Sequence, residues 1–214
     1  MNGHIDRISD YLIRNRQRIL NYFRLCYWVL GLFIPIAVVL SRLNEKLLLF
    51  LFSTGTIFAK TALISFILTL LPGLCERLGI KHKGIALLKI YRREIGILMY
   101  LAALVHVTLS KVIIIESLQD VLTPFPFEIM GSVSLLILFL LFITSNTISL
   151  VKLRLNWYRI QRLTYIGMFF IFLHVAFLSF SIWSILMGII IILQVVSFIV
   201  VYRRTGSFIG GKPA

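Results

Sequence analysis

Apolar runs separated by short polar segments make up the chain from residue 23 to residue 202. Most runs are close to about 20 residues long, the length that an α-helix needs to cross the hydrocarbon core of a bilayer. Runs of this length predict membrane-spanning helices. The predicted spans are about 23–41, 47–71, 93–117, 128–149, 159–180 and 182–202. The sequence therefore predicts an all-α membrane protein built as a six-transmembrane-helix bundle.

Prolines and short connections set the expected ends of these helices. Pro72 and Gly73 are expected to end the second span, and Pro124 with Pro126 breaks the chain before the fourth. Only a few residues around Ser181 separate the fifth span from the sixth. These last two helices are therefore predicted to form a tight hairpin.

The distribution of charge predicts how the bundle is oriented. The chain has 22 Lys and Arg residues against 8 Asp and Glu, a net charge of +14. Most basic residues precede the first span, follow the last one, or lie in the connections after the second and fourth. The opposite side has few charges: Arg42, Lys46, Lys111, Glu45, Glu116, Asp120 and Glu128. By the positive-inside rule, both termini are expected in the cytoplasm.

Two terminal segments flank the predicted membrane domain, which covers residues 23–202. Residues 1–22 are basic, and positions 5–20 alternate apolar and charged side chains. This pattern is typical of a basic amphipathic helix on the membrane surface. A solvated basic tail that only sets orientation would show the same pattern. Residues 203–214 are predicted to form a short cytoplasmic tail.

A net charge of +14 in a soluble protein would suggest nucleic-acid binding. Here 59% of the residues are hydrophobic and the mean hydropathy is +0.97. The basic residues lie between apolar runs, so we expect membrane lipid and no nucleic acid as a partner. The sequence also has no dinucleotide-binding fingerprint and leaves no residues for a flavin or nicotinamide domain. We therefore expect electrons to come from a separate reductase, a quinone or another membrane-protein partner.

Two histidines lie deep inside predicted spans. His106 is in the third span and His174 is in the fifth. An ionisable side chain at that depth is costly unless it is paired or ligated, so it marks a candidate functional site. With a helix rise of about 1.5 Å per residue, His106 lies about 20 Å and His174 about 22 Å from the cytoplasmic side.

Equal depth on two parallel helices is the geometry that two axial ligands of one haem require. Hydrogen bonds from each histidine to a neighbouring helix are the alternative. Small residues on the same helices, Ala102, Ala103 and Gly167, would let a porphyrin or another helix approach closely.

Lys60 lies near the middle of the second span. An isolated ammonium group at that depth is costly. We expect an anionic partner, such as a haem propionate, and assign Lys60 to the cofactor-binding residues. Snorkelling toward a polar pocket between helices is the alternative.

Four segments appear in a recognisable order. They are Thr54-Gly55 with Lys60 and Pro72, YRREIGILMYLAALVH (91–106), MGSVSLLILFLLFITSN (130–146) and NWYRIQRLTYIGMFFIFLH (156–174). Together they resemble the ferric-reductase-like transmembrane domain family. The chain looks most similar to the bacterial branch that contains the haem-binding membrane subunit of the periplasmic methionine sulfoxide reductase system. This resemblance implies a multi-pass protein of the bacterial inner (plasma) membrane.

The resemblance further implies one b-type haem held by histidines on the third and fifth helices, here His106 and His174. The chain departs from the family at the cytoplasmic side. Gln161 stands where many members have a histidine, and Arg92 and Arg93 occupy the level of an inner ligand on the third helix. Glutamine is a poor iron ligand and arginine keeps its proton, so a second haem is not expected. These residues would bind a quinone or a flavin, or only set orientation.

The sequence therefore predicts a b-type haem-binding membrane electron-transfer subunit, an oxidoreductase component with no catalytic residue of its own. It would relay electrons from a cytoplasmic or membrane donor to an acceptor at the outer face. A non-redox membrane subunit or scaffold that retains the fold is the alternative.

Overall fold

The computed structural model describes residues 11–115 and 122–206. All regular secondary structure in these ranges is helical. The elements are α2 (Arg16–Ser41), α3 (Glu45–Leu78), α4 (Lys83–Ser110), the 3-10 helix η1 (Val112–Ile114), α6 (Pro126–Ile143), α7 (Thr147–Leu153), α8 (Leu155–Gln161), α9 (Leu163–Leu178) and α10 (Ile182–Thr205).

Six helical segments in the described ranges are long and apolar enough to cross a membrane. They are α2, α3, α4 with η1, α6, α8 with α9, and α10. The prediction of an all-α, six-span membrane protein is confirmed. Side chains that face outward are also largely apolar: Trp28 is 72% exposed and Leu136 is 66% exposed. A surface of this kind is suited to lipid.

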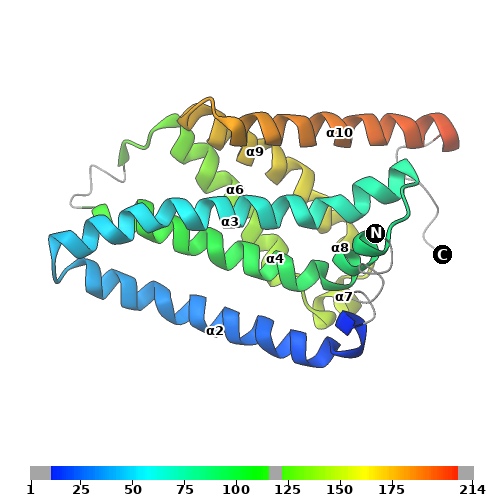
Figure 1. Ribbon diagram of the computed structural model, residues 1–214. Coiled ribbons are helices and arrows are strands. Elements are labelled where there is room, and N and C mark those ends of the chain that lie inside the picture. The colour runs from blue at the N-terminus through cyan, green and yellow to red at the C-terminus, as the bar shows by residue number, and fades with distance from the viewer. Residues whose placement is uncertain (1–10, 116–121, 207–214) are drawn as a thin grey trace.

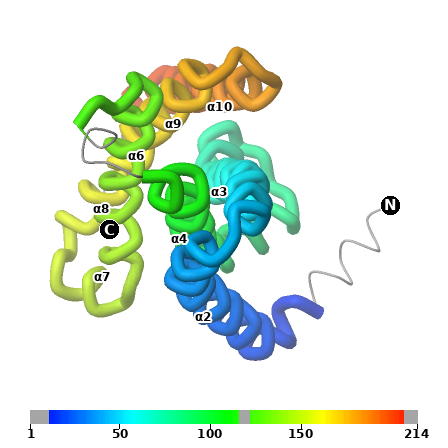
Figure 2. The backbone as a smooth tube through the Cα atoms, turned by 90° about the vertical axis from the view of Figure 1, so that its left-hand side faces the viewer, coloured from blue at the N-terminus to red at the C-terminus, as the bar shows by residue number. Residues whose placement is uncertain are grey.

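Helix α4 is the central element of the bundle, because it packs against α2, α3 and α6 (Figures 1 and 2). Helix α9 packs on α6, and α10 lies against both α9 and α3. Figure 1 also shows that the turn between α9 and α10 lies short of the turn between α2 and α3. The bundle therefore does not end in one plane at that end.

Two apolar clusters hold the helices together. The larger joins α3, α4, α6, α9 and α10 through side chains such as Phe66, Met99, Leu138 and Met187. The smaller joins α2, α3 and α4 and η1, and its members are Ala37, Leu51, Val105, Leu109 and Ile113. Both clusters bury residues of α4, which keeps that helix in a fixed position along its length.

The prediction that Pro72 and Gly73 end the second span is wrong. Helix α3 continues through the buried Pro72 to Leu78. A proline removes one backbone donor, but continuing the helix satisfies the remaining backbone groups, which a membrane environment demands. Gly79 caps the helix: its φ is +76° and its backbone N–H contacts the carbonyls of Cys75 and Glu76. That left-handed conformation favours glycine.

The third span also begins elsewhere than predicted. Helix α4 starts at Lys83, where the His82 side chain accepts a hydrogen bond from the N–H of Gly84 at 3.1 Å. The fifth span begins with α8 at Leu155 and continues as α9 from Leu163, within a few residues of the predicted start. The start of the fourth span at Pro126 and the short connection between α9 and α10 agree with the sequence.

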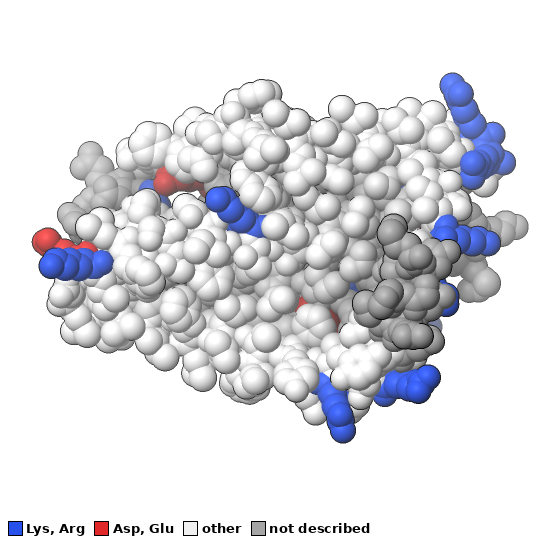
Figure 3. Space-filling view, in the orientation of Figure 1, with Lys and Arg blue, Asp and Glu red and all other residues white. Residues whose placement is uncertain are grey.

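Figure 3 shows basic side chains gathered over one end of the bundle. This basic end is where α2, α4 and α9 begin and where α3 and α10 end. We call the opposite end the histidine end, because His106 and His174 lie close to it. The described part of the predicted N-terminal segment is helical: residues 11–14 are followed, after Asn15, by α2. The other residues of that segment and most of the C-terminal tail lie outside the described ranges.

Candidate functional site

His106 and His174 lie next to each other between α4 and α9. Their ring centroids are 6.4 Å apart and the ring planes make an angle of 64°. Each histidine lies four residues before the end of its helix, His106 before Ser110 and His174 before Leu178. Four residues correspond to about 6 Å of helix, so both rings lie about one turn from the histidine end.

Backbone and side-chain oxygens fix the ring of His106. Its Nδ1 lies 3.0 Å from the carbonyl oxygen of Gly55 in α3 and 3.1 Å from Oγ of Ser110. A carbonyl oxygen only accepts hydrogen bonds, so Nδ1 carries the proton and donates it. Nε2 is then the nitrogen with a free lone pair, the tautomer that binds a metal.

His174 is held in the same way by α6. Its Nδ1 lies 2.7 Å from the carbonyl oxygen of Phe127, so this nitrogen also donates. Gly131 leaves room for the ring, because a Cβ at that position would lie 2.7 Å from Nδ1 of His174. Both histidines therefore present Nε2 as the available ligand atom.

The spacing of the rings fits two axial ligands of one iron. A metal lies about 2.0–2.1 Å from an imidazole nitrogen, and two imidazoles on opposite sides of it have ring centroids about 6.3 Å apart. The observed separation is 6.4 Å. Within residues 11–115 and 122–206, no group of three or more His, Cys, Asp or Glu side chains could hold a metal ion. A two-imidazole set suits haem iron, whose other ligands come from the porphyrin.

A second candidate site is a cavity between α4, α6 and α8, toward the basic end. Its volume is about 310 Å³, and its lining includes Arg92, Arg93 and Gln161. Met99 also lines it, seven residues before His106. That separation corresponds to about 10 Å along α4. The structure thus brings three predicted cofactor-binding residues to one cavity. Helix α4 lines this cavity and also carries His106.

Polar contacts fix the wall of this cavity that α8 provides. Nε1 of Trp157 donates to the carbonyl oxygen of Thr144 at 2.9 Å, and Nε2 of Gln161 donates to Oγ1 of Thr144 at 3.3 Å. Both contacts join α8 to the end of α6. The indole and amide groups therefore have defined positions beside the cavity.

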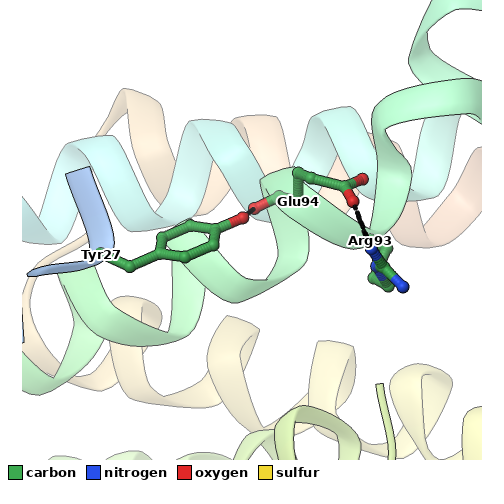
Figure 4. Close-up of polar contacts among 3 residues, drawn as sticks. All are labelled: Tyr27, Arg93 and Glu94. Atoms are coloured by element: carbon green, nitrogen blue, oxygen red, sulfur yellow. Dashed lines mark hydrogen bonds and ion pairs between the residues drawn. The ribbon is translucent and has the colours of Figure 1, made fainter. Parts of the chain in front are cut away.

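Arg93 is paired with its neighbour Glu94, a residue that the sequence analysis did not single out. Nε and Nη2 of Arg93 donate to Oε1 of Glu94 at 3.1 and 2.8 Å (Figure 4). The Glu94 side chain is 8% exposed, whereas that of Arg93 is 52% exposed. The hydroxyl of Tyr27 in α2 donates to the carbonyl oxygen of Glu94 at 3.1 Å. The position of Glu94, directly after two arginines in an apolar run, was the sequence signal that could have indicated this pair.

Arg92 differs from Arg93. Among the described residues no carboxylate forms an ion pair with Arg92. Arg92 nevertheless lines the cavity. The cavity therefore presents a guanidinium group whose charge is not balanced by direct contact with a described carboxylate.

Lys60 lies apart from this cavity. Its Nζ is 5.9 Å from the ring centroid of Trp183, the second residue of α10, and the residue is exposed. Such a contact with an indole ring stabilises a cation. Gly167 serves helix packing, because a Cβ there would lie 3.2 Å from Cγ2 of Ile137 in α6.

Arg77, one of the basic residues that follow the second predicted span, forms a polar cluster that the sequence did not reveal. Its guanidinium group donates to Oγ of Ser197 at 2.8 Å, to the hydroxyl of Tyr165 at 3.0 Å, and to Oε1 of Gln194. It also lies 4.3 Å from the ring centroid of Phe198. These contacts fasten α3 to α9 and α10 at the basic end.

A family model described as the ferric reductase like transmembrane component matches residues 54–173. The match covers more than half of the 214 residues, from α3 to α9, and ends directly before His174. The chain belongs to the ferric reductase-like transmembrane family. No curated protein and no solved structure matches it. As a ferric reductase-like transmembrane component with six spans, it is a multi-pass membrane component of electron transfer.

Proposed function

We propose that this ferric reductase-like protein binds one b-type haem between His106 and His174 and is the electron-transfer subunit of a larger system. One observation carries the proposal: the two imidazole rings lie 6.4 Å apart, and Nδ1 of each contacts a backbone carbonyl oxygen. This arrangement leaves Nε2 of each ring available as a ligand atom, and the separation of the ring centroids is the one expected for two imidazoles on one iron.

The chain itself prepares both ligands. A hydrogen bond from Nδ1–H to a carbonyl oxygen fixes the tautomer, orients the ring and makes Nε2 more basic. Gly55 supplies one of these oxygens and Phe127 the other, so each ligand is oriented by a helix other than its own. When bound, a haem with two imidazole ligands supplies one-electron transfer.

Charge supports an orientation with the basic end in the cytoplasm and the histidine end at the outer face. In that orientation the histidine pair lies about one helical turn from the outer ends of α4 and α9. The final acceptor would then approach the outer face, and a separate reductase or membrane partner would approach the basic face. The resemblance of the sequence supports a place in a bacterial inner membrane, beside a periplasmic methionine sulfoxide reductase.

The cavity at Arg92, Arg93 and Gln161 is proposed to hold a second carrier, a quinone or a flavin. Its volume of about 310 Å³ falls within the range of small-ligand sites. Guanidinium and amide groups are suitable donors to quinone oxygens or to a flavin phosphate. A carrier there would shorten the distance between the basic face and the histidine pair.

The pyridine haemochrome assay on purified protein tests the proposal. We expect one haem b per chain, with a low-spin spectrum that is lost in His106→Ala and in His174→Ala. His82→Ala is the matched control, because His82 lies at the start of α4 and should leave the spectrum unchanged. A parent protein without haem, despite adequate supply, would contradict the proposal and favour a non-redox scaffold. Two haems per chain would show that the second cavity also holds haem.

A further inference from the structure

An ion pair joins the two elements that support the histidine rings. Nζ of Lys111 lies 2.7 Å from Oε1 of Glu128. Lys111 directly follows the last residue of α4, and Glu128 lies in the first turn of α6. The side chains are 29% and 19% exposed, so the pair is partly shielded from solvent.

Each partner is adjacent to a residue that contacts a histidine. Lys111 follows Ser110, whose Oγ lies 3.1 Å from Nδ1 of His106. Glu128 follows Phe127, whose carbonyl oxygen lies 2.7 Å from Nδ1 of His174. The ion pair therefore connects the support of one ring to the support of the other.

Glu128 also fixes the beginning of α6 directly. Its Oε2 accepts a hydrogen bond from the backbone N–H of Phe125 at 3.0 Å. One carboxylate thus holds both the end of α4 and the first turn of α6. Because the Phe127 carbonyl belongs to that turn, its position depends on this carboxylate.

The pair is also the ion pair nearest to the histidines among those of the described residues. The other two, Lys89 with Glu76 and Arg93 with Glu94, lie toward the basic end. Partly buried charges are screened less by salt than exposed ones. Opposite charges at short distance nearly cancel each other at a distant point, so removal of one exposes the field of the other.

We propose that Lys111 and Glu128 are positioning residues that hold the two ligand supports together and set the reduction potential of the centre between them. The proposal rests on the proposed function, that the histidine pair binds haem. A positive charge left near the centre favours its reduced state, and a negative charge left there favours its oxidised state. Loss of Glu128 should therefore raise the potential, and loss of Lys111 should lower it.

The experiment is a spectroscopic redox titration of the purified holoprotein with three variants: Glu128→Gln, Lys111→Met and the double variant. Glutamine keeps an acceptor for the Phe125 N–H, since Glu and Gln both serve at this helix position. We expect potential shifts of opposite sign in the single variants and a potential close to the parent's in the double variant. Glu45→Gln and Lys46→Met are matched controls, because both residues are exposed at the turn between α2 and α3. Neither control should shift the potential.

Shifts of the same sign, or shifts no larger than those of the controls, would each overturn the role of the pair. These outcomes are distinct from failure of the proposed function. A parent protein without haem refutes haem binding before any variant is compared. A haem-loaded parent with unaltered potentials in the variants refutes only the inference about Lys111 and Glu128.

Discussion

The carbonyl oxygen of Phe127 lies 2.7 Å from Nδ1 of His174, so the first turn of α6 orients a side chain that belongs to α9. His106 is oriented in the same manner by the Gly55 carbonyl of α3, at 3.0 Å. Neither histidine depends on its own helix alone for its ring position. The packing of α3 on α4 and of α6 on α9 is therefore part of the site.

Gly131→Ala should displace the ring of His174. A Cβ at this position would lie 2.7 Å from Nδ1 and 3.0 Å from Cε1 of that ring. We expect a loss of stability of about 1–3 kcal/mol, typical of overpacking, and a clear loss of bound haem. Thermal unfolding and the haemochrome assay measure the two effects. Gly31→Ala is the control, because nothing lies within 4 Å of a Cβ there. Full haem content in Gly131→Ala would contradict the prediction.

Gly55→Ala should bring α3 into conflict with α4. A Cβ on residue 55 would lie 2.6 Å from Oγ of Ser110 and 3.2 Å from Cβ of Leu109. We expect destabilisation of about 1–3 kcal/mol, as for other overpacked contacts. Ser110→Ala in the same chain removes the nearest atom and should restore part of the lost stability. A thermal unfolding cycle over the four proteins gives the coupling, and simple additivity would argue against the clash.

Arg93→Gln should destabilise the protein more than Glu94→Gln does. The Glu94 side chain is 8% exposed, so removal of its partner leaves a buried carboxylate with less compensation. Arg93 is 52% exposed and can be solvated when Glu94 is neutral. The difference should be about 1–3 kcal/mol, the range for leaving a buried polar group without its partner. Equal losses in thermal or denaturant unfolding would show that the pair is not asymmetric.

Arg92→Gln and Gln161→Ala should slow the reduction of the histidine centre by a donor on the basic side. Both residues line the cavity proposed for the second carrier, whereas neither contacts His106 or His174. The haem spectrum should therefore remain that of the parent. Stopped-flow reduction in sealed vesicles measures the rate. Arg159→Gln provides a control at an exposed arginine of α8 outside the cavity. Unchanged rates in both cavity variants would remove the relay from the proposal.

A reporter enzyme that works only in the cytoplasm should be active when it is fused after residue 214. A reporter that works only outside the cytoplasm should be inactive at the same position. The charge distribution predicts this result, since the basic end includes the end of α10. A fusion in the connection between α2 and α3 should show the opposite preference. The reverse pattern would place the histidine pair near the cytoplasm and reverse the proposed direction of electron transfer.

The number of spans and the helical class could be predicted from the sequence, because apolar length and periodicity are local properties of the chain. Helix ends were harder to predict where a local signal competed with the membrane. Pro72 and Gly73 appeared to end the second span, yet α3 continues to Leu78 because an unsatisfied backbone is costly in lipid. The αL conformation at Gly79 marks the actual end, and a sequence does not report φ.

The candidate site could likewise be predicted only in part from the sequence. The sequence by itself indicated His106 and His174, because ionisable side chains are rare in apolar spans. Arg92, Arg93 and Gln161 were indicated by the resemblance to the ferric-reductase-like family, as positions that depart from its pattern. Only the tertiary structure decided that Phe127 and Gly55 supply the acceptors for the histidines, that Gly131 leaves space for one ring, and that Lys111 meets Glu128. These contacts join residues on different helices, and their geometry depends on how the helices pack, which local sequence patterns do not encode.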